Sequence, residues 1–209
     1  MSSIVRHVLA AESAQGRPER DGLSPRRVVL VPGVLALLPE YAGLSDPVAE
    51  LRAACLAAVS WLTGPVEIVA DEQGRRVAEH LLVSTGSTTE GAGSTAEGAG
   101  STAEGAGAEG DASYLVVANG SACRGEKAPG HLDERSFAFD AEIDKALRTP
   151  DGAALAGVDE ALGAELWAGN VAGLRRLGGL LAGAGVPVVD YADDPFGVQY
   201  WVMRWTCES

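Results

Sequence analysis

The sequence predicts a three-layer α/β/α fold, in which helices cover a mostly parallel or mixed central sheet. Short runs of apolar, often β-branched residues recur along the chain, and stretches with apolar residues at helical spacing lie between them. Strands that alternate with helices favour parallel pairing, because each helix returns the chain to the start of the next strand. Apolar residues make up 46% of the 209 residues, which is enough for a buried core.

In the first half of the chain, two predicted strands flank one predicted helix. Arg27–Val31 is a short β-branched run that is typical of a buried strand. Ser45-Asp46-Pro47 then supplies a helix cap and a first-turn proline, and apolar residues at helical spacing follow as far as Leu62. Val66–Ala70 predicts the second strand.

The second half contains a third strand, then helices, then two closing strands. Tyr114–Ala118 predicts another buried strand. Phe137, Ile143 and Leu147 share one stripe of a predicted helix, with Asp140 on the opposite side. Two more helices and two closing strands are predicted at Asp159–Ala168, Val171–Ala184, Val186–Tyr191 and Val198–Trp205. The closing strands are also compatible with an antiparallel hairpin at the edge of the sheet.

Two segments have compositions that do not suit a packed core. Residues 1–26 mix polar residues and glycine with little periodicity, which predicts a disordered tail. Residues 86–106 consist of three seven-residue repeats, GSTTEGA followed by two copies of GSTAEGA. No repeat position holds a large apolar residue, so a flexible linker at about 85–111 is predicted instead of a coiled coil. Residues 27–206 are expected to form one α/β domain that this linker interrupts.

Composition excludes several classes of function. The formal net charge of −13 argues against nucleic acid as a partner, because phosphate binding needs clustered basic residues. No stretch approaches the roughly 20 apolar residues that a membrane span requires. Three widely spaced cysteines (Cys55, Cys123 and Cys207) fit neither a disulfide framework nor a zinc site, and a reducing, cytoplasmic location is predicted.

A polar loop after the predicted strand at Tyr114–Ala118 is the best candidate for a binding site. Loops at the carboxyl ends of strands are where α/β folds place their ligands. Residues in this loop that are suited to contacting a ligand are Asn119, Ser121, Arg124, Glu126, Lys127 and His131, with Asp133 at the rim. Arg124 and Lys127 are the predicted contacts for an anion. An alternative role for Asn119 and Ser121 is to cap the next element through side-chain hydrogen bonds to the backbone.

Other chemistry that this loop suggests is weaker. Glu126 separates Gly125 from Lys127, so the segment does not match a phosphate-binding loop. The chain also lacks the GxSxG elbow of serine hydrolases. Cys123 stands beside Arg124 and close to Lys127, two positive charges that would lower the pKa of its thiol.

The order of several motifs resembles a known family. The motifs are Val31-Pro32 with Leu37-Leu38-Pro39-Glu40, Leu115–Ser121, Lys127-Ala128-Pro129-Gly130, Phe139-Asp140, Gly173-Leu174-Arg175 and Asp194–Tyr200. In this order they resemble class III extradiol ring-cleavage dioxygenases, in particular small actinobacterial members of that family. The Memo proteins belong to the same superfamily. The resemblance covers residues 27–70 and 113–206.

The resemblance implies an Fe(II) site built from two histidines and a carboxylate, with a further histidine as acid/base. At the two histidine ligand positions this chain has Gly33 and the segment Ala70-Asp71-Glu72. Ala122 stands at the acid/base position, and Asn170-Val171 stands where the glutamate ligand is implied. Glycine, alanine and valine side chains have no lone pair to offer a metal, so an iron site of the family's type is not expected.

The sequence therefore predicts an extradiol dioxygenase-like protein that has lost catalysis and needs no cofactor. A binding role is expected to remain, for a small aromatic or anionic ligand or for a partner protein. The alternative is an active Fe(II)-dependent ring-cleavage dioxygenase of a catecholic substrate, with relocated ligands. The metal ligands of that alternative are His80, His131 and a carboxylate, from Glu72 or from Glu126.

Overall fold

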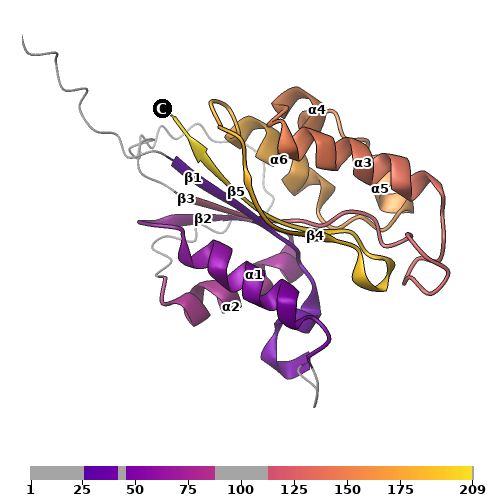
Figure 1. Ribbon diagram of the computed structural model, residues 1–209, viewed down its shortest axis with the longest axis horizontal. Helices are drawn as coiled ribbons and strands as arrows, with labels where there is room; N and C mark the ends of the chain where they lie inside the picture. Colours follow the sequence, from indigo (N-terminus) through magenta and orange to yellow (C-terminus); the bar gives the residue numbers. More distant parts are fainter. Residues whose placement is uncertain (1–25, 42–45, 88–112, 209) are drawn as a thin grey trace, which may run out of the picture.

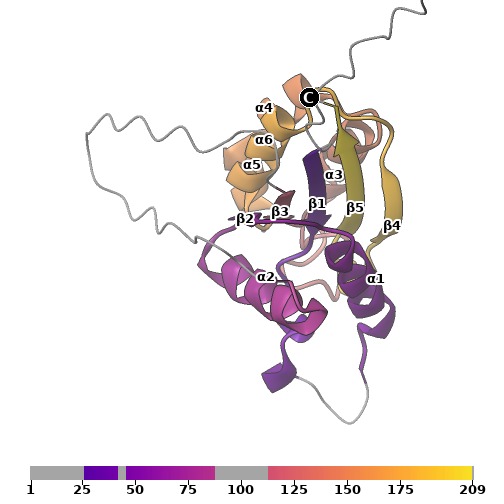
Figure 2. The same ribbon diagram turned by 90° about the vertical axis from the view of Figure 1, so that its left-hand side faces the viewer.

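The computed structural model describes residues 26–41, 46–87 and 113–208, which form one five-stranded sheet with helices on both faces (Figures 1 and 2). The predicted three-layer α/β/α fold is thereby confirmed. The strands are β1 (Arg26–Val31), β2 (Val66–Val69), β3 (Ser113–Val117), β4 (Val188–Asp193) and β5 (Tyr200–Cys207). The α-helices are α1 (Ala49–Ser60), α2 (Glu72–Thr85), α3 (Arg135–Arg148), α4 (Gly152–Ala156), α5 (Glu160–Glu165) and α6 (Val171–Leu180). Short 3₁₀ helices are η1 (Leu35–Leu37), η2 (Pro39–Tyr41) and η3 (Pro195–Gly197).

The sheet is mixed and has the strand order β2-β3-β1-β5-β4. β1, β2 and β3 are parallel, so their carboxyl ends lie at one edge of the sheet. β5 runs antiparallel to both β1 and β4, which confirms the hairpin alternative for the closing strands. The start of β5 therefore lies at the same edge as the ends of the parallel strands. We call this region, where the parallel strands end and β5 begins, the strand edge; the name does not refer to an outer strand of the sheet.

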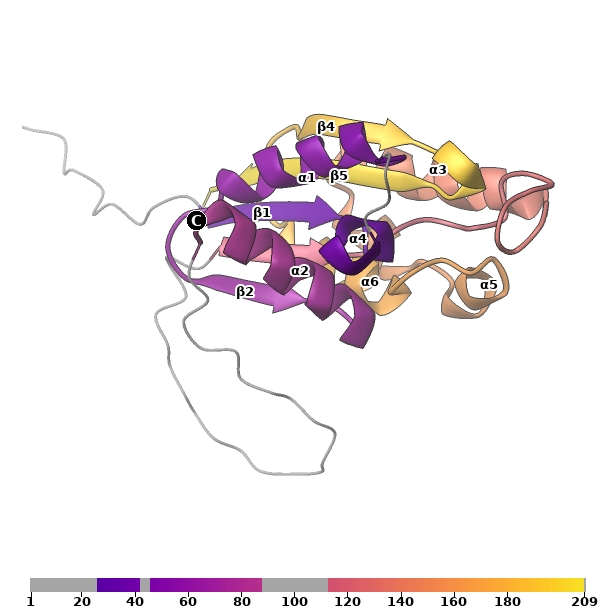
Figure 3. The ribbon, with the colours of Figure 1, turned by 90° about the horizontal axis from the view of Figure 1, so that it is seen from below.

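Each face of the sheet has its own apolar core. Alternate residues of β1 point to opposite faces, so Val29 and Val31 join one core while Val28 and Leu30 join the other. α1 and α2 cover the first face, and Figure 3 shows both helices in front of the strands. α3, α5 and α6 cover the second face, with α4 packed against α6.

The two crossovers between the parallel strands have opposite hands. The chain passes from β1 through α1 to β2 at the edge of the sheet, then returns through α2 to β3 between them. α1 and α2 pack in the same apolar layer. Two crossovers in opposite directions on one face cannot both be right-handed, although right-handed crossovers are the strong rule. No pattern in the sequence indicates this departure.

α2 is the main element that the sequence analysis did not assign. The Asp71 carboxylate caps its first turn by accepting a 2.6 Å hydrogen bond from the Gly74 amide, and Gly86 ends it with a left-handed backbone. The predicted linker begins one residue too early, because Thr85 belongs to α2. The predicted tail ends one residue too late, because Arg26 belongs to β1. The rest of the predicted tail and most of the linker lie outside the described residues.

The stripe predicted for α3 is wrong at two positions. Phe137 is 44% exposed, whereas Asp140 is 2% exposed and faces the sheet. Phe139, Ile143 and Leu147 form the buried face instead. Asp140 can lie in this buried face because backbone and side-chain groups donate hydrogen bonds to its carboxylate, as described below.

Smaller differences concern the ends of elements. α4 was not predicted, α6 is shorter than expected, and β4 and β5 each begin two residues later than predicted. The predicted cap of α1 also differs, because the Asp46 carboxylate accepts from the Val48 amide just ahead of the helix. No helix among the described residues is long and apolar enough to cross a membrane.

Candidate functional site

The predicted binding loop lies at the strand edge, between β3 and α3. Asn119 forms an isolated bridge with Gly169 ahead of α6, and the Gly120 amide donates to the Gln199 carbonyl ahead of β5. This contact leaves no room for a side chain at Gly120, since an added Cβ would lie 2.5 Å from Asp140 Oδ1. Segments far apart in the sequence are therefore held together at this edge.

A buried carboxylate organises the loop. Asp140 Oδ1 accepts a hydrogen bond from the Ser121 amide at 2.8 Å, and Oδ2 accepts from the Ser121 hydroxyl at 2.5 Å. Arg124 Nη1 also donates to Oδ2, at 3.2 Å, and Arg124 Nε donates to Asp194 at 2.6 Å. The Arg124 guanidinium lies 4.8 Å from the centre of the Phe137 ring. The loop before α3, α3 itself and the connection between β4 and β5 are thus tied to one charge network.

Burial raises the pKa of Asp140 above its ordinary value, even though Ser121 and Arg124 act in the opposite direction. The cost of removing the carboxylate from water thus outweighs the stabilisation that these donors provide.

The neighbouring thiol of Cys123 has a pKa that differs from the one predicted from the sequence. The pKa of the Cys123 thiol is raised, first by burial and then by the charges of Asp133 and Asp140, so the predicted lowering is wrong.

The predicted ligand contacts occupy different environments. Ser121 is fully buried, and the Arg124 donors described above point at protein carboxylates. Asn119 is half-buried, and its amide donates to the carbonyl of Gly120, so neither Asn119 nor Ser121 caps the next helix. Glu126, Lys127 and His131 are exposed along the loop.

Three of the four positions at which the resemblance implies iron chemistry lie near the end of β3. An added Cβ on Gly33 would lie 3.2 Å from Val117 Cγ1, and Ala122 belongs to the same apolar core as Val117. The Asn170 amide donates to the Val117 carbonyl at 2.7 Å, while its oxygen caps α6 by accepting from the Gly173 amide.

The side chains at these positions have structural roles. Asp71, in the segment Ala70-Asp71-Glu72 where the second histidine is implied, caps α2 as described above. The Gly33 carbonyl accepts a hydrogen bond from Gln73 Nε2 at 2.8 Å. Apolar packing and helix capping therefore occupy the place where ligands are implied.

The alternative metal ligands are not gathered into a metal site. His80 lies on α2, half-buried in a surface hollow of about 420 Å³ that Glu40, Arg76 and Glu79 also line. Glu72 is the exposed first residue of α2, and His131 belongs to the loop after β3. Within the described ranges, no group of three or more histidine, cysteine, aspartate or glutamate side chains is arranged to hold a metal ion.

Exposed rings surround the strand edge, and the sequence analysis did not find most of them. His131, Trp167 and Phe196 have positive φ angles of 58°, 57° and 67°, a conformation that costs free energy in residues other than glycine. Trp167 is 60% exposed and Phe196 is 59% exposed. The Trp167 ring lies beside the backbone of Gly130, just before His131. Only the fold brings the three loops that carry these rings to the strand edge, so the sequence offered no direct indication of them.

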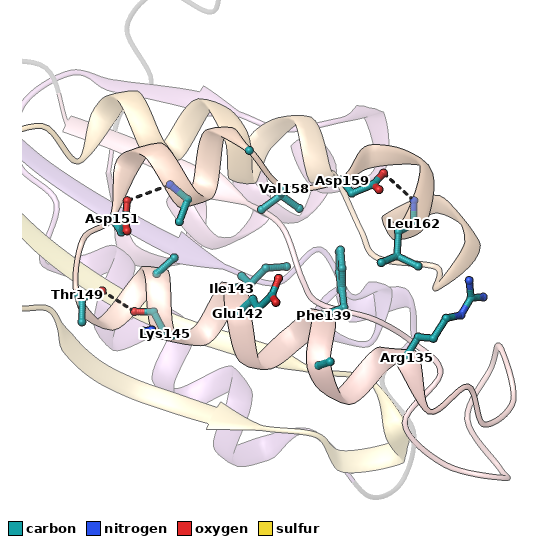
Figure 4. Close-up of a pocket in the computed structure, with 14 residues that line it drawn as sticks. Arg135, Phe139, Glu142, Ile143, Lys145, Thr149, Asp151, Val158, Asp159 and Leu162 are labelled. Carbon is teal, nitrogen blue, oxygen red and sulfur yellow. Dashed lines mark hydrogen bonds between the residues drawn. The ribbon is translucent and has the colours of Figure 1, made fainter.

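A second candidate site is a cavity of about 680 Å³ between α3 and the α4–α5 segment (Figure 4). Phe139, Ile143, Val158 and Leu162 contribute apolar side chains to its walls. Charged residues also line it, namely Arg135, Glu142, Lys145, Asp151 and Asp159. The cavity shares none of these residues with the strand-edge network, and the sequence analysis did not predict it.

No model of a known protein family matches the sequence, and neither does any curated protein.

Proposed function

We propose that the protein is an extradiol dioxygenase-like protein that does not catalyse ring cleavage and instead binds a small aromatic ligand at the strand edge. The side chains and contacts at the implied iron positions support the loss of catalysis. Gly33 and Ala122 offer no ligand atom, and Asn170 is committed to capping α6 and to the Val117 carbonyl. An Fe(II) centre at that place would lack the imidazole ligands that the family's chemistry requires.

The rings at the strand edge support the binding role. Left-handed backbone at His131, Trp167 and Phe196 is maintained at a cost in stability, and such strain is characteristic of binding sites. Exposed planar rings suit a planar aromatic partner molecule. An anionic ligand is less well supported, because Arg124 already donates hydrogen bonds to the carboxylates of Asp140 and Asp194.

Iron content and turnover test the loss of catalysis. The full-length protein is loaded anaerobically with Fe(II), desalted and analysed by mass spectrometry for metal content, beside a His80→Ala/His131→Ala variant. We expect equal and substoichiometric iron in both, and no turnover of catechol or protocatechuate. Near-stoichiometric iron that the double substitution removes, together with turnover above roughly 1 s⁻¹, would establish the relocated-ligand dioxygenase instead.

Titration with catechol without iron tests the binding role. Backbone amides at the strand edge should shift in NMR spectra, and Trp167→Ala should weaken binding about tenfold, because a stacked ring contributes roughly that much. Val83→Ala is the matched control, since Val83 is an exposed apolar residue on α2 away from this edge. Equal affinities for the Trp167 and Val83 variants would contradict the proposal.

A further inference from the structure

The cavity between α3 and the α4–α5 segment has the dimensions of a small-molecule site. Its volume of about 680 Å³ lies within the ~300–1,000 Å³ that ligand pockets occupy. Phe139 and Ile143 from α3 face Val158 and Leu162 across it, so its walls are apolar along much of its length (Figure 4). Burial of an apolar body against these walls is favourable.

Negative charge predominates among the ionised groups that line the cavity. Arg135 is neutralised by Asp133 and Glu165, to which it donates hydrogen bonds of 2.7 Å. Lys145 is the other basic residue of the lining. The lining also contains three carboxylates, those of Glu142, Asp151 and Asp159, so acidic groups outnumber basic groups in this lining.

The three carboxylates differ in how they are engaged. Asp151 caps α4 and Asp159 caps α5, so both accept hydrogen bonds from backbone amides. Glu142 has no hydrogen bond or ion pair with any residue in the part of the chain that the structure describes. Figure 4 shows the Glu142 carboxylate beside Ile143, between α3 and Val158. Glu142 is exposed, so its carboxylate faces solvent beside the apolar side chains of the cavity. A carboxylate without a protein partner next to apolar side chains favours a ligand that has both a cation and an apolar body.

We propose that this cavity binds a small organic cation, a primary amine that is linked to an aromatic or branched aliphatic group. The amine lies against the Glu142 carboxylate, and the apolar group packs on Phe139, Ile143 and Leu162. The net charge of −13 on the chain further raises the local concentration of cations. The proposal does not rest on binding at the strand edge, because the two sites share no residue.

Four probes of similar chemistry separate the contributions of charge and apolar body. They are 2-phenylethylamine, the neutral 2-phenylethanol, the anionic 3-phenylpropionate and the short cation ethylamine. Affinities are measured by calorimetry and by amide shifts in NMR spectra of the full-length protein. We expect 2-phenylethylamine to bind about tenfold or more tightly than each of the others, with shifts along α3, α4 and α5.

Three variants locate the site. Glu142→Gln keeps the size of the side chain and should weaken 2-phenylethylamine about tenfold while leaving 2-phenylethanol unchanged. Ala138→Phe places a ring in the cavity from an exposed position and should weaken both compounds. Glu79→Gln is the control, because Glu79 is an exposed carboxylate on α2 that lines the other hollow.

The results distinguish this proposal from other binding. Equal affinity of the wild type and Glu142→Gln would overturn it, as would a larger loss with Glu79→Gln or a preference for 3-phenylpropionate. Shifts confined to the strand edge would also overturn it, and in that case the proposed function would stand alone. Circular dichroism verifies that each variant is folded, and the shift map of the wild type tests the location without any substitution.

Discussion

Asp140 shows how one residue can connect several parts of this fold. It occupies the buried face of α3, yet its carboxylate is matched by the Ser121 amide, the Ser121 hydroxyl and Arg124. A buried carboxylate is stabilised only when such donors surround it. The same donors fix the loop after β3, so this residue determines the shape of the strand edge.

Replacing Asp140 with Asn should destabilise the protein by about 1–3 kcal/mol at pH 7. The new amide group would direct N–H donors at Ser121 and Arg124, which are themselves donors in this network. Urea unfolding followed by circular dichroism measures the loss. Asp133→Asn is the control, because Asp133 pairs with Arg135 at the surface and its loss should have a smaller effect. Equal effects of the two substitutions would contradict this account.

The effect of Asp140→Asn should also depend on pH. Because the folded-state pKa of Asp140 is raised above 3.8, the folded protein holds this proton over a pH range in which the unfolded chain has lost it. The contribution of Asp140 to the free energy of unfolding therefore falls as the pH rises through that range. Asn does not titrate, so the difference in stability between the wild type and the variant should shrink from pH 3.8 upward. A difference that grows would mean that pairing with Arg124 lowers this pKa.

At the scale of elements, α6 illustrates how the start of a helix is fitted to the strand edge. Asn170 has a φ of 54° and caps the helix through the Gly173 amide. Its side-chain amide also donates to the Val117 carbonyl at the end of β3. Asparagine tolerates the left-handed region better than most residues, which explains why it suits this position.

Two substitutions of Asn170 should differ in their cost. Asn170→Ala removes the cap and places alanine in the left-handed region, for a loss of about 2–3 kcal/mol. Asn170→Gly also removes the cap but relieves the backbone strain, so its loss should be about 1 kcal/mol smaller. The free energy of unfolding in urea measures both. Identical losses would show that backbone conformation contributes nothing here.

At the scale of the whole molecule, two apolar cores share one sheet. Cys55 is buried in the core beneath α1 and α2, whereas Cys207 is buried in the opposite core. Burial raises the pKa of the Cys55 thiol to about 12 and also raises the pKa of Cys207. Since the same strands contribute side chains to both cores, neither core can be lost without exposing the other.

The two cores should therefore unfold together. Pulsed alkylation along a urea series, read by mass spectrometry, should label Cys55 and Cys207 with the same midpoint. Labelling at about pH 8 keeps both thiols unreactive in the folded protein, because their raised pKa values leave little thiolate. Circular dichroism of the same samples is the control for global unfolding. Labelling of Cys55 at clearly lower urea would divide the chain into two folding units.

The sequence by itself determined the succession of the main strands along the chain, the fold class and the position of the polar loop after β3. Runs such as the one in β1 are apolar on both faces, and this local property is enough to identify a buried strand. α2 was not predicted because most of its residues are polar or charged. Its apolar stripe is recognisable as a buried face only once α2 packs beside α1 in the same core. The sequence also determined which side chains stand at the implied iron positions.

Only the tertiary structure decided what those residues do. It turned Asp140 inward, where the helical stripe predicted a solvent-facing residue, because donors from a loop nineteen residues earlier satisfy it. It brought Gly33, Asn170 and Val117 together, and it placed the loops that carry Trp167 and Phe196 at the strand edge. The cavity exists because α3 and the α4–α5 segment pack with a space between them. Such contacts depend on how helices meet across a sheet, and no local pattern in the chain encodes that distance.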